Sequence, residues 1–251
     1  MPHSKNQILS RASLRDFNLL QPHLRLVDLE LGHVIVDSRQ RVNTVIFPHG
    51  GILSCVVNLE DGSSIETGMI GNDGVFGAMQ AIDERLSLNK VMVQVPTRAS
   101  VVDAAVVREI ANSSPDFRGL IVKYEQFFLG QVQQTTACNA VHTIEDRTCK
   151  WLIRMYDLAG PDLPLTQEFL AQMMGVRRTS VTTVAMKLQE EGLIEYRRGR
   201  IRIRDIEAVQ FHACECADAV RKGYVQVFGQ EEKQFDRGPG LNKIASNRCE
   251  H

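Results

Sequence analysis

The side chains in this chain that are best suited to a chemical task are basic and hydroxyl groups gathered in one short segment. Eight Lys and Arg residues but only three acids lie between Val176 and Arg204, although the formal net charge of the 251-residue chain is −1. Such a local excess of positive charge is typical of a surface that meets phosphate groups. The basic residues are Arg177, Arg178, Lys187, Arg197, Arg198, Arg200, Arg202 and Arg204.

The spacing around this segment predicts two short helices joined by a tight turn. Thr166 can cap a helix that runs through Met174, and Gly175 can adopt the positive φ that ends it. In a second helix, Arg177–Glu190, apolar residues recur at spacings of three and four and predict one buried stripe. That stripe consists of Val181, Val184, Ala185 and Leu188.

The second helix starts with Arg and hydroxyl residues, which fits a helix-turn-helix. In that motif the N-terminal part of the second helix enters the major groove. Arg can make two hydrogen bonds to guanine, and Thr can bond a base edge or a phosphate. Two alternating stretches, Ile194–Tyr196 and Ile201–Ile203, flank Arg198-Gly199 and predict a hairpin wing whose arginines meet the DNA backbone.

The first hundred residues have a different pattern, of short apolar runs separated by turn residues. Asp61-Gly62 lies between two of these runs and favours a tight hairpin, because Gly accepts a positive φ. Many short strands at close spacing predict an antiparallel sandwich or jelly roll, preceded by a short helix over Leu14–Leu20. The predicted strands are Val34–Val36, Val42–Phe47, Ile52–Asn58, Ser64–Ile70, Val91–Val95 and Ala99–Asp103.

A long helix is predicted over residues 116–141, which contain no Pro. One stripe on it has heptad spacing, apolar at its start and polar later. Packing on the protein's own sheet would explain the apolar part. Contact with a second copy of the helix would explain the whole stripe, because polar groups in a dimer seam fix the register of the two helices. We predict this dimer. The stripe is Ile121, Tyr124, Phe128, Gln131, Thr135 and Cys138.

These patterns predict an α+β fold with four parts. A β-roll sensor domain would occupy residues 1–115 and the dimerisation helix 116–141, followed by a winged helix-turn-helix over 142–211 and a C-terminal helix with a polar tail over 212–251. No apolar run approaches the roughly 18 residues that span a bilayer, and the N-terminus lacks the apolar core of a secretory signal. We therefore expect a cytoplasmic protein with no membrane partner.

The stretch Leu165 to Arg204 resembles the winged helix-turn-helix of the cyclic-AMP receptor/fumarate-nitrate regulator (CRP/FNR) family, and the order of the parts is similar over nearly the whole chain. The resemblance implies a transcription regulator that binds double-stranded DNA as a homodimer, with RNA polymerase as a further partner. It implies base-reading roles for Arg178, Thr179 and Thr183. Where the family often has an Arg-Glu pair this chain has Arg178-Thr179, so its target should differ. The implied phosphate contacts are Thr166, Gln167, Arg177, Ser180, Arg197, Arg198 and Arg200.

Members of the family that bind cyclic nucleotides use a Gly-Glu-Leu turn for the ribose and a nearby Arg for the phosphate. Here Ala78 stands in the place of that Glu, and the stretch Leu88–Val91 offers no Arg. Without both partners we expect no tight binding of cyclic AMP. A pocket for an unknown effector is one interpretation of this region, and glycines that only turn the chain are the other. The candidate pocket residues are Gly74, Phe76, Gly77, Ala78, Tyr124 and Phe128.

The six cysteines are scattered, and the N-terminal part offers only Cys55, so a four-cysteine iron–sulfur cluster has no support there. His212, Cys214 and Cys216 lie close together in sequence and are a candidate metal or redox site. We favour the alternative that they pack as small helical residues, and we predict no metal and no cofactor. Candidate haem ligands are His33, His49 and His142, although a lone His is more often a surface residue.

Two other classes of function compete with the regulator. One is a small-molecule or redox sensor that acts through protein partners with little DNA binding. The other is an enzyme, which we do not predict, because the sequence shows no nucleophile with a nearby base, no phosphate loop and no His/carboxylate metal motif. Steep salt dependence of duplex binding would separate the regulator from the sensor, because phosphate contacts release counterions.

Overall fold

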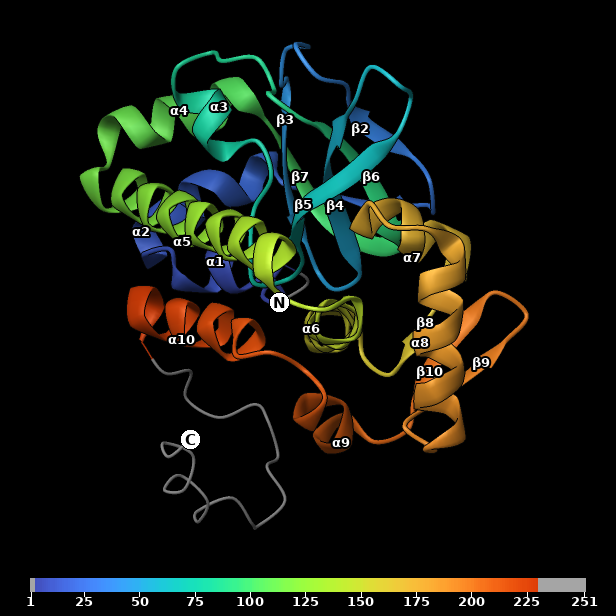
Figure 1. Cartoon of the computed structure of the whole chain (residues 1–251). Helices are drawn as coiled ribbons and strands as arrows, with labels where there is room; N and C mark the ends of the chain where they lie inside the picture. The colour runs from blue at the N-terminus through green and yellow to red at the C-terminus, as the bar shows by residue number, and fades with distance from the viewer. Residues whose placement is uncertain (1–2, 230–251) are drawn as a thin grey trace.

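A computed structural model describes residues 3–229, and the predicted polar tail with Cys249 lies outside them. Two short helices, α1 (Gln7–Arg11) and α2 (Leu14–Leu20), precede a β-rich part, which a long helix separates from a helical C-terminal part (Figure 1). The strands of the β-rich part are β1 (Arg25–Leu29), β2 (Val34–Val36), β3 (Thr44–Pro48), β4 (Ile52–Asn58), β5 (Ser64–Ile70), β6 (Lys90–Val95) and β7 (Thr97–Asp103).

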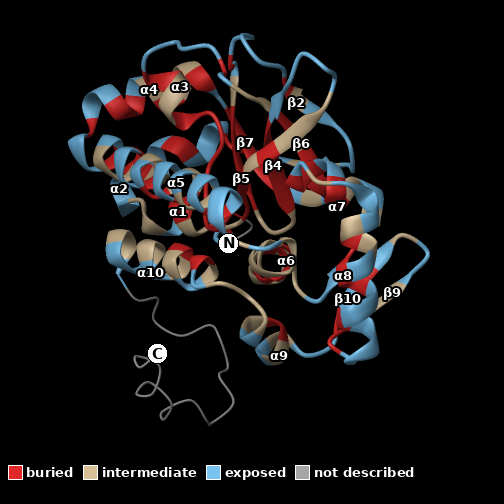
Figure 2. Cartoon of the chain, viewed as in Figure 1, coloured by how far each residue is buried: buried red, intermediate tan, exposed pale blue. Residues whose placement is uncertain are grey.

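The seven strands form two antiparallel sheets, in the orders β1-β7-β3 and β2-β6-β4-β5, which confirms the predicted sandwich. Helix α3 (Ala78–Ile82) lies between β5 and β6 in the sequence, and α4 (Ala104–Ser113) follows β7. The pattern of the sequence missed β1, because its side chains range only from exposed to half-buried and give no alternating apolar signal. Buried residues concentrate in the strands, as Figure 2 shows.

Helix α5 (Pro115–Val141) is the long helix. Pro115 suits its first turn, where the missing N–H needs no partner, and the Ser114 side chain accepts a hydrogen bond from the Phe117 N–H. Phe117 and Ile121 join the core beneath the two sheets. The helix ends at Val141, and the next residue, His142, has an extended backbone (φ −94°, ψ 153°) and turns the chain into the next helix.

The heptad stripe of α5 faces the inside of its own chain, which corrects its assignment to a dimer seam. Ile121, Tyr124, Gln131 and Cys138 are all buried without a second copy. Gln131 explains the error, since its amide accepts a hydrogen bond from the Met69 N–H (3.1 Å) and donates one to the Met69 carbonyl (3.3 Å). Strand β5 thus satisfies the polar position that had indicated a partner helix.

The C-terminal part begins with α6 (Ile144–Ala159), which starts in a capping box formed by Thr143 and Asp146. A three-stranded sheet in the order β8-β10-β9 and two final helices follow, and the last helix runs back alongside α5 (Figure 1). No described helix is long and apolar enough to cross a membrane. The remaining elements are β8 (Asp162–Leu163), α7 (Gln167–Met174), α8 (Arg178–Glu190), β9 (Ile194–Arg197), β10 (Arg200–Ile203), α9 (Ile206–Phe211) and α10 (Cys216–Phe228).

The β-rich part and the C-terminal part share a second hydrophobic core. Ile52 and Met69 of the β-rich part pack in one cluster with Leu152 and Met173 of the C-terminal part. An ion pair at 2.7 Å joins Asp73 to Arg154 across the same contact, and both side chains are largely buried. The β-rich part and the C-terminal part are therefore joined both by apolar packing and by a buried ion pair.

Candidate nucleic-acid interface and the junction behind it

The turn between α7 and α8 is built as the sequence predicts. The Thr166 hydroxyl accepts a hydrogen bond from the Phe169 N–H (3.1 Å), and Gly175 ends α7 with φ +63°. Arg177 is the N-cap of α8, so the helix starts one residue later than predicted, at Arg178. No side chain in the described part of the chain caps this helix, so its first N–H groups are available to an anion such as a DNA phosphate.

Helix α8 separates an inner apolar face from an outer polar face. The predicted stripe of Val181, Val184, Ala185 and Leu188 is buried in the second core. Arg178, Thr179 and Thr183 are exposed on the outside, where Arg178 lies 3.9 Å from the Glu168 carboxylate and the Thr183 hydroxyl donates to the Thr179 carbonyl (3.1 Å). A weak, exposed ion pair of this kind is readily exchanged for a base edge.

The wing is a hairpin whose tip lies beside the start of α7. Arg198 and Gly199 both have positive φ, 47° and 77°, and form the turn between β9 and β10. A Cβ added at Gly199 would lie 3.4 Å from the methyl group of Thr166, so the wing and the N-cap of α7 form one continuous surface. Gln167, at the start of α7, accepts a hydrogen bond from the Thr182 hydroxyl (2.8 Å), and Ser180, in the first turn of α8, is half-buried.

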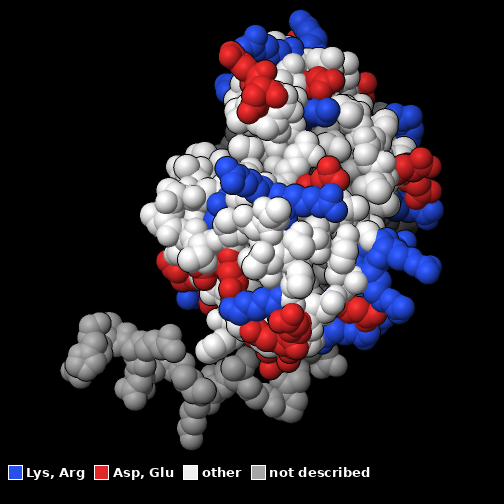
Figure 3. Space-filling view, turned by 45° about the vertical axis from the view of Figure 1, so that its right-hand side comes forward, with Lys and Arg blue, Asp and Glu red and all other residues white. Residues whose placement is uncertain are grey.

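Intramolecular ion pairs divide the arginines of this surface into two groups. Arg197 and Arg204 both contact Glu195, and Arg202 lies 3.5 Å from Asp162. Within residues 3–229, Arg177, Arg198 and Arg200 form no ion pair. These three exposed guanidinium groups therefore remain for an external anion. Lys and Arg side chains project together from the right-hand side of the face drawn in Figure 3.

Residues 146–210 match the family model of the Crp-like helix-turn-helix domain. The chain thus has a Crp-like helix-turn-helix domain on a CRP/FNR fold. Three solved structures show this likeness. FixK2 from Bradyrhizobium japonicum is 13% identical with a TM-score of 0.64, over 76% of this chain and 98% of that one. A CRP-family transcriptional regulator from Thermus thermophilus is 16% identical with a TM-score of 0.63, over 74% and 96%.

The third structure is the c-di-GMP-responsive global regulator CLP from Xanthomonas campestris. It is 15% identical with a TM-score of 0.60, over 76% of this chain and 99% of that one. At these identities the likeness establishes the fold. No curated protein matches the chain.

Two glycines of the predicted effector pocket lie directly against other side chains. A Cβ added at Gly74 would lie 2.3 Å from the Tyr124 hydroxyl oxygen, and one at Gly77 would lie 2.7 Å from Val42. Ala78 is buried at the start of α3, and the backbone of Phe76 bonds that of Ile46 in both directions (2.8 and 2.9 Å). The Phe128 ring lies against Gly68, where an added Cβ would be 2.9 Å from it.

A cavity of about 50 Å³ lies instead between β5, α5 and α6, and Glu66 is part of its lining. The Glu66 carboxylate is buried and accepts hydrogen bonds from the Trp151 indole (2.8 Å) and the Ser54 hydroxyl (2.6 Å). Burial raises the pKa of Glu66 from 4.5 to about 7, against the effect of these donors and of Lys150. No pattern in the sequence indicates this contact, because Trp151 lies on α6, 85 residues further along the chain.

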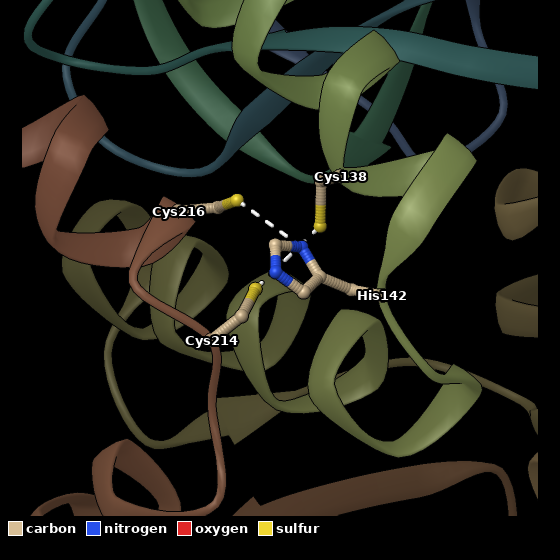
Figure 4. Close-up of side chains that lie close together, drawn as sticks. All are labelled: Cys138, His142, Cys214 and Cys216. Carbon is tan, nitrogen blue, oxygen red and sulfur yellow. Dashed lines mark hydrogen bonds between the residues drawn. The ribbon is translucent and has the colours of Figure 1, made fainter. Parts of the chain in front are cut away.

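A second group that sequence reasoning missed lies at the end of α5. Cys138, His142, Cys214 and Cys216 point toward one another, and their ligand atoms all lie within 4.8 Å of each other (Figure 4). His212, the third member of the group predicted from the sequence, lies elsewhere, with its ring nitrogens 3.1 Å from Glu145 and 3.2 Å from Glu191.

The sequence favours simple packing of His212, Cys214 and Cys216, with a metal or redox site only as the alternative. The structure keeps Cys214 and Cys216 together, but His212 does not belong to the group. The partners of the two cysteines lie much earlier in the chain, with separations of 76 residues from Cys138 to Cys214 and 74 from His142 to Cys216, which no local spacing reveals. We call the four residues Cys138, His142, Cys214 and Cys216 the Cys₃His cluster.

Proposed function

We propose that this chain is a sequence-specific transcription regulator that binds an inverted-repeat operator as a homodimer. The observation that carries the proposal is α8, which buries its apolar stripe while Arg178, Thr179 and Thr183 stay exposed at its uncapped end. A helix held in this way can enter the major groove end-first, with Arg178 placed for the edge of a guanine. The match of residues 146–210 to the Crp-like domain supports the same role.

The surrounding surface would hold the DNA backbone and fix the register of α8. Arg177, Arg198 and Arg200 supply charge that no acid within residues 3–229 pairs with, and Thr166, Gln167 and Ser180 supply shorter polar groups. Contacts of this kind position a protein on DNA and carry little sequence information. Base preference in this proposal therefore depends on Arg178, Thr179 and Thr183.

The outer face of α5 is our proposed dimer contact. Val122 and Leu129, with exposed fractions of 46% and 56%, lie seven residues apart, and small or polar side chains alternate with them. A second copy of α5 would bury this line in the manner of a coiled coil. Two-fold symmetry would then present two copies of α8 to two half-sites about one duplex turn apart. The exposed line consists of Val122, Gln126, Leu129, Gln133, Thr136 and Ala140.

Control by a signal would act through the contact between the sensor and the Crp-like domain. Glu66 bonds Trp151, and Asp73 pairs with Arg154, so a change in the β5 region alters how α6 is held. Such a change would shift the population of DNA-competent dimers. The effector remains an unknown small molecule in this proposal, tight binding of cyclic AMP is not expected, and RNA polymerase is a further partner.

Selection of bound sequences from a random duplex pool by the purified chain tests the proposal. We expect an inverted repeat, bound with an affinity that falls steeply as salt rises. Sedimentation should show a dimer that Leu129→Glu dissociates and that Leu88→Glu leaves intact, because Leu88 is 85% exposed on a sensor loop. A chain that enriches no sequence and binds duplexes without salt dependence would instead be a sensor acting through protein partners.

A further inference from the structure

We infer that the Cys₃His cluster is a binding site for one zinc-class divalent ion, which fixes the end of α5 to the start of α10. The inference needs no DNA and no effector. It rests on four side chains from two distant segments, on the distances between them, and on the groups that surround them.

The distances match those around one tetrahedral ion. The Cys138 and Cys214 sulfurs are 3.6 Å apart, and the Cys216 sulfur is 3.5 Å from His142 Nδ1. With metal–sulfur bonds of about 2.3 Å and metal–nitrogen bonds of about 2.0 Å, tetrahedral geometry requires about 3.8 Å between sulfurs and about 3.5 Å between sulfur and nitrogen. Small side-chain rotations would bring the remaining pairs, within 4.8 Å, to these separations.

The donor set also selects the class of ion. Three thiolates and one imidazole form a closed set that is typical of structural zinc and leaves no position open for a substrate. Soft sulfur ligands disfavour magnesium and calcium, which prefer oxygen. An iron–sulfur cluster spreads its ligands over several iron atoms, and ligand atoms this close together suit a single ion better.

Groups next to the cluster support the ligands. His142 Nε2 lies 3.4 Å from the Glu215 carboxylate, so the nitrogen that would not bind the ion faces an acid. The Gln134 side-chain amide donates a hydrogen bond to the Cys216 sulfur (3.1 Å). Acids and amides in these positions commonly orient metal ligands and fix the histidine tautomer.

Charge balances when the ion binds. The three thiols release three protons to solvent, and three thiolates with one neutral imidazole around a divalent ion give the site a net charge of −1. Lys150 is close enough to interact electrostatically with all three cysteines and would offset this charge. Its ammonium group is held in place by a hydrogen bond to Thr135 (3.0 Å).

The position of the cluster gives the ion a structural task. Cys138 lies in the last turn of α5, His142 is the extended residue between α5 and α6, and Cys216 begins α10. One ion would therefore hold the hinge that joins the sensor to the Crp-like domain. It would also hold α10 on α5, where Tyr224 meets Phe127 at a ring-centre distance of 5.1 Å.

Metal analysis of the full chain, purified without chelator from zinc-supplemented cells, tests the inference. We expect about one zinc per chain. Cobalt added to the zinc-free protein should give the visible absorption of tetrahedral cobalt–thiolate. Cys138→Ser and Cys216→Ser should lose both signals, whereas Cys149→Ala and His212→Ala should keep them. Neither control residue belongs to the group of four ligands, because Cys149 packs in the second hydrophobic core and His212 pairs with acids.

A second variant covers the case in which the ligand variants fail to fold. Glu215→Gln keeps every ligand and should weaken zinc binding about 10- to 100-fold, measured by competition with a chromophoric chelator. The inference would be overturned by a chain without zinc and without the cobalt spectrum, or by a Cys138–Cys214 disulfide in freshly purified protein. Iron with sulfide, or unchanged zinc affinity in Glu215→Gln, would also overturn it.

Discussion

The DNA-recognition surface that we propose on α8 and the Cys₃His cluster are built in opposite ways. The proposed recognition surface comes from one continuous segment, residues 166–204, in which local spacing decides which side chains are buried. The cluster joins Cys138 and His142 to Cys214 and Cys216 only because α10 runs back along α5. The surface on α8 is charged and exposed, whereas the cluster is enclosed. We therefore expect the two regions to respond differently to substitution.

The largest expected effect is on stability, at the cluster. Removing the proposed ion should lower the free energy of unfolding by about 4 kcal/mol when free zinc is roughly 1,000 times its dissociation constant. Urea unfolding with and without a chelator measures this loss. Arg178→Ala should change the same free energy by less than about 0.5 kcal/mol, because the residue is exposed. Equal losses of unfolding free energy on zinc removal and in Arg178→Ala would contradict this difference between the two regions.

The next effect belongs to Glu66, which links the sensor to the Crp-like domain. Its folded pKa of about 7 lies above the ordinary 4.5, so the contribution of this group to stability is complete below about pH 4.5 and is lost as the pH rises through 7. Relative to Glu66→Gln, the wild type should lose up to about 3 kcal/mol over this range. Parallel pH profiles of unfolding for the two proteins would contradict the assignment.

A smaller effect is expected on DNA affinity. Arg178→Ala should weaken binding to the selected operator by roughly 1–3 kcal/mol per half-site, through loss of a paired contact to one base. Fluorescence anisotropy with labelled duplex measures it. Arg25→Ala is the matched control, since Arg25 is an exposed arginine on β1 of the sensor. A similar loss in the control would indicate a general effect of charge.

The smallest effect concerns the wing. Arg200→Ala should weaken binding to all duplexes by a similar factor and reduce the slope of log affinity against log salt by about one, as expected for one phosphate contact. Arg202→Ala should change the slope less, because Asp162 already pairs with Arg202. If Arg200→Ala left the slope of log affinity against log salt unchanged, this result would show that Arg200 of the wing does not contact the DNA backbone.

What the sequence predicts well is what neighbours along the chain decide. The stripe on α8, the Thr166 cap and the turn at Gly175 depend on residues within one or two helical turns, and the structure confirms them. Gln131 was misplaced because its partner is the backbone of β5, far away in sequence. Glu66 was missed for the same reason, because its burial depends on Trp151.

Paired binding-site selections with the wild type and Arg178→Ala test most directly whether α8 reads DNA. We expect the wild type to enrich an inverted repeat and the variant to enrich the same repeat with one relaxed position in each half-site. Identical preferences in the two selections, or no enriched sequence in either, would contradict the role given to the start of α8.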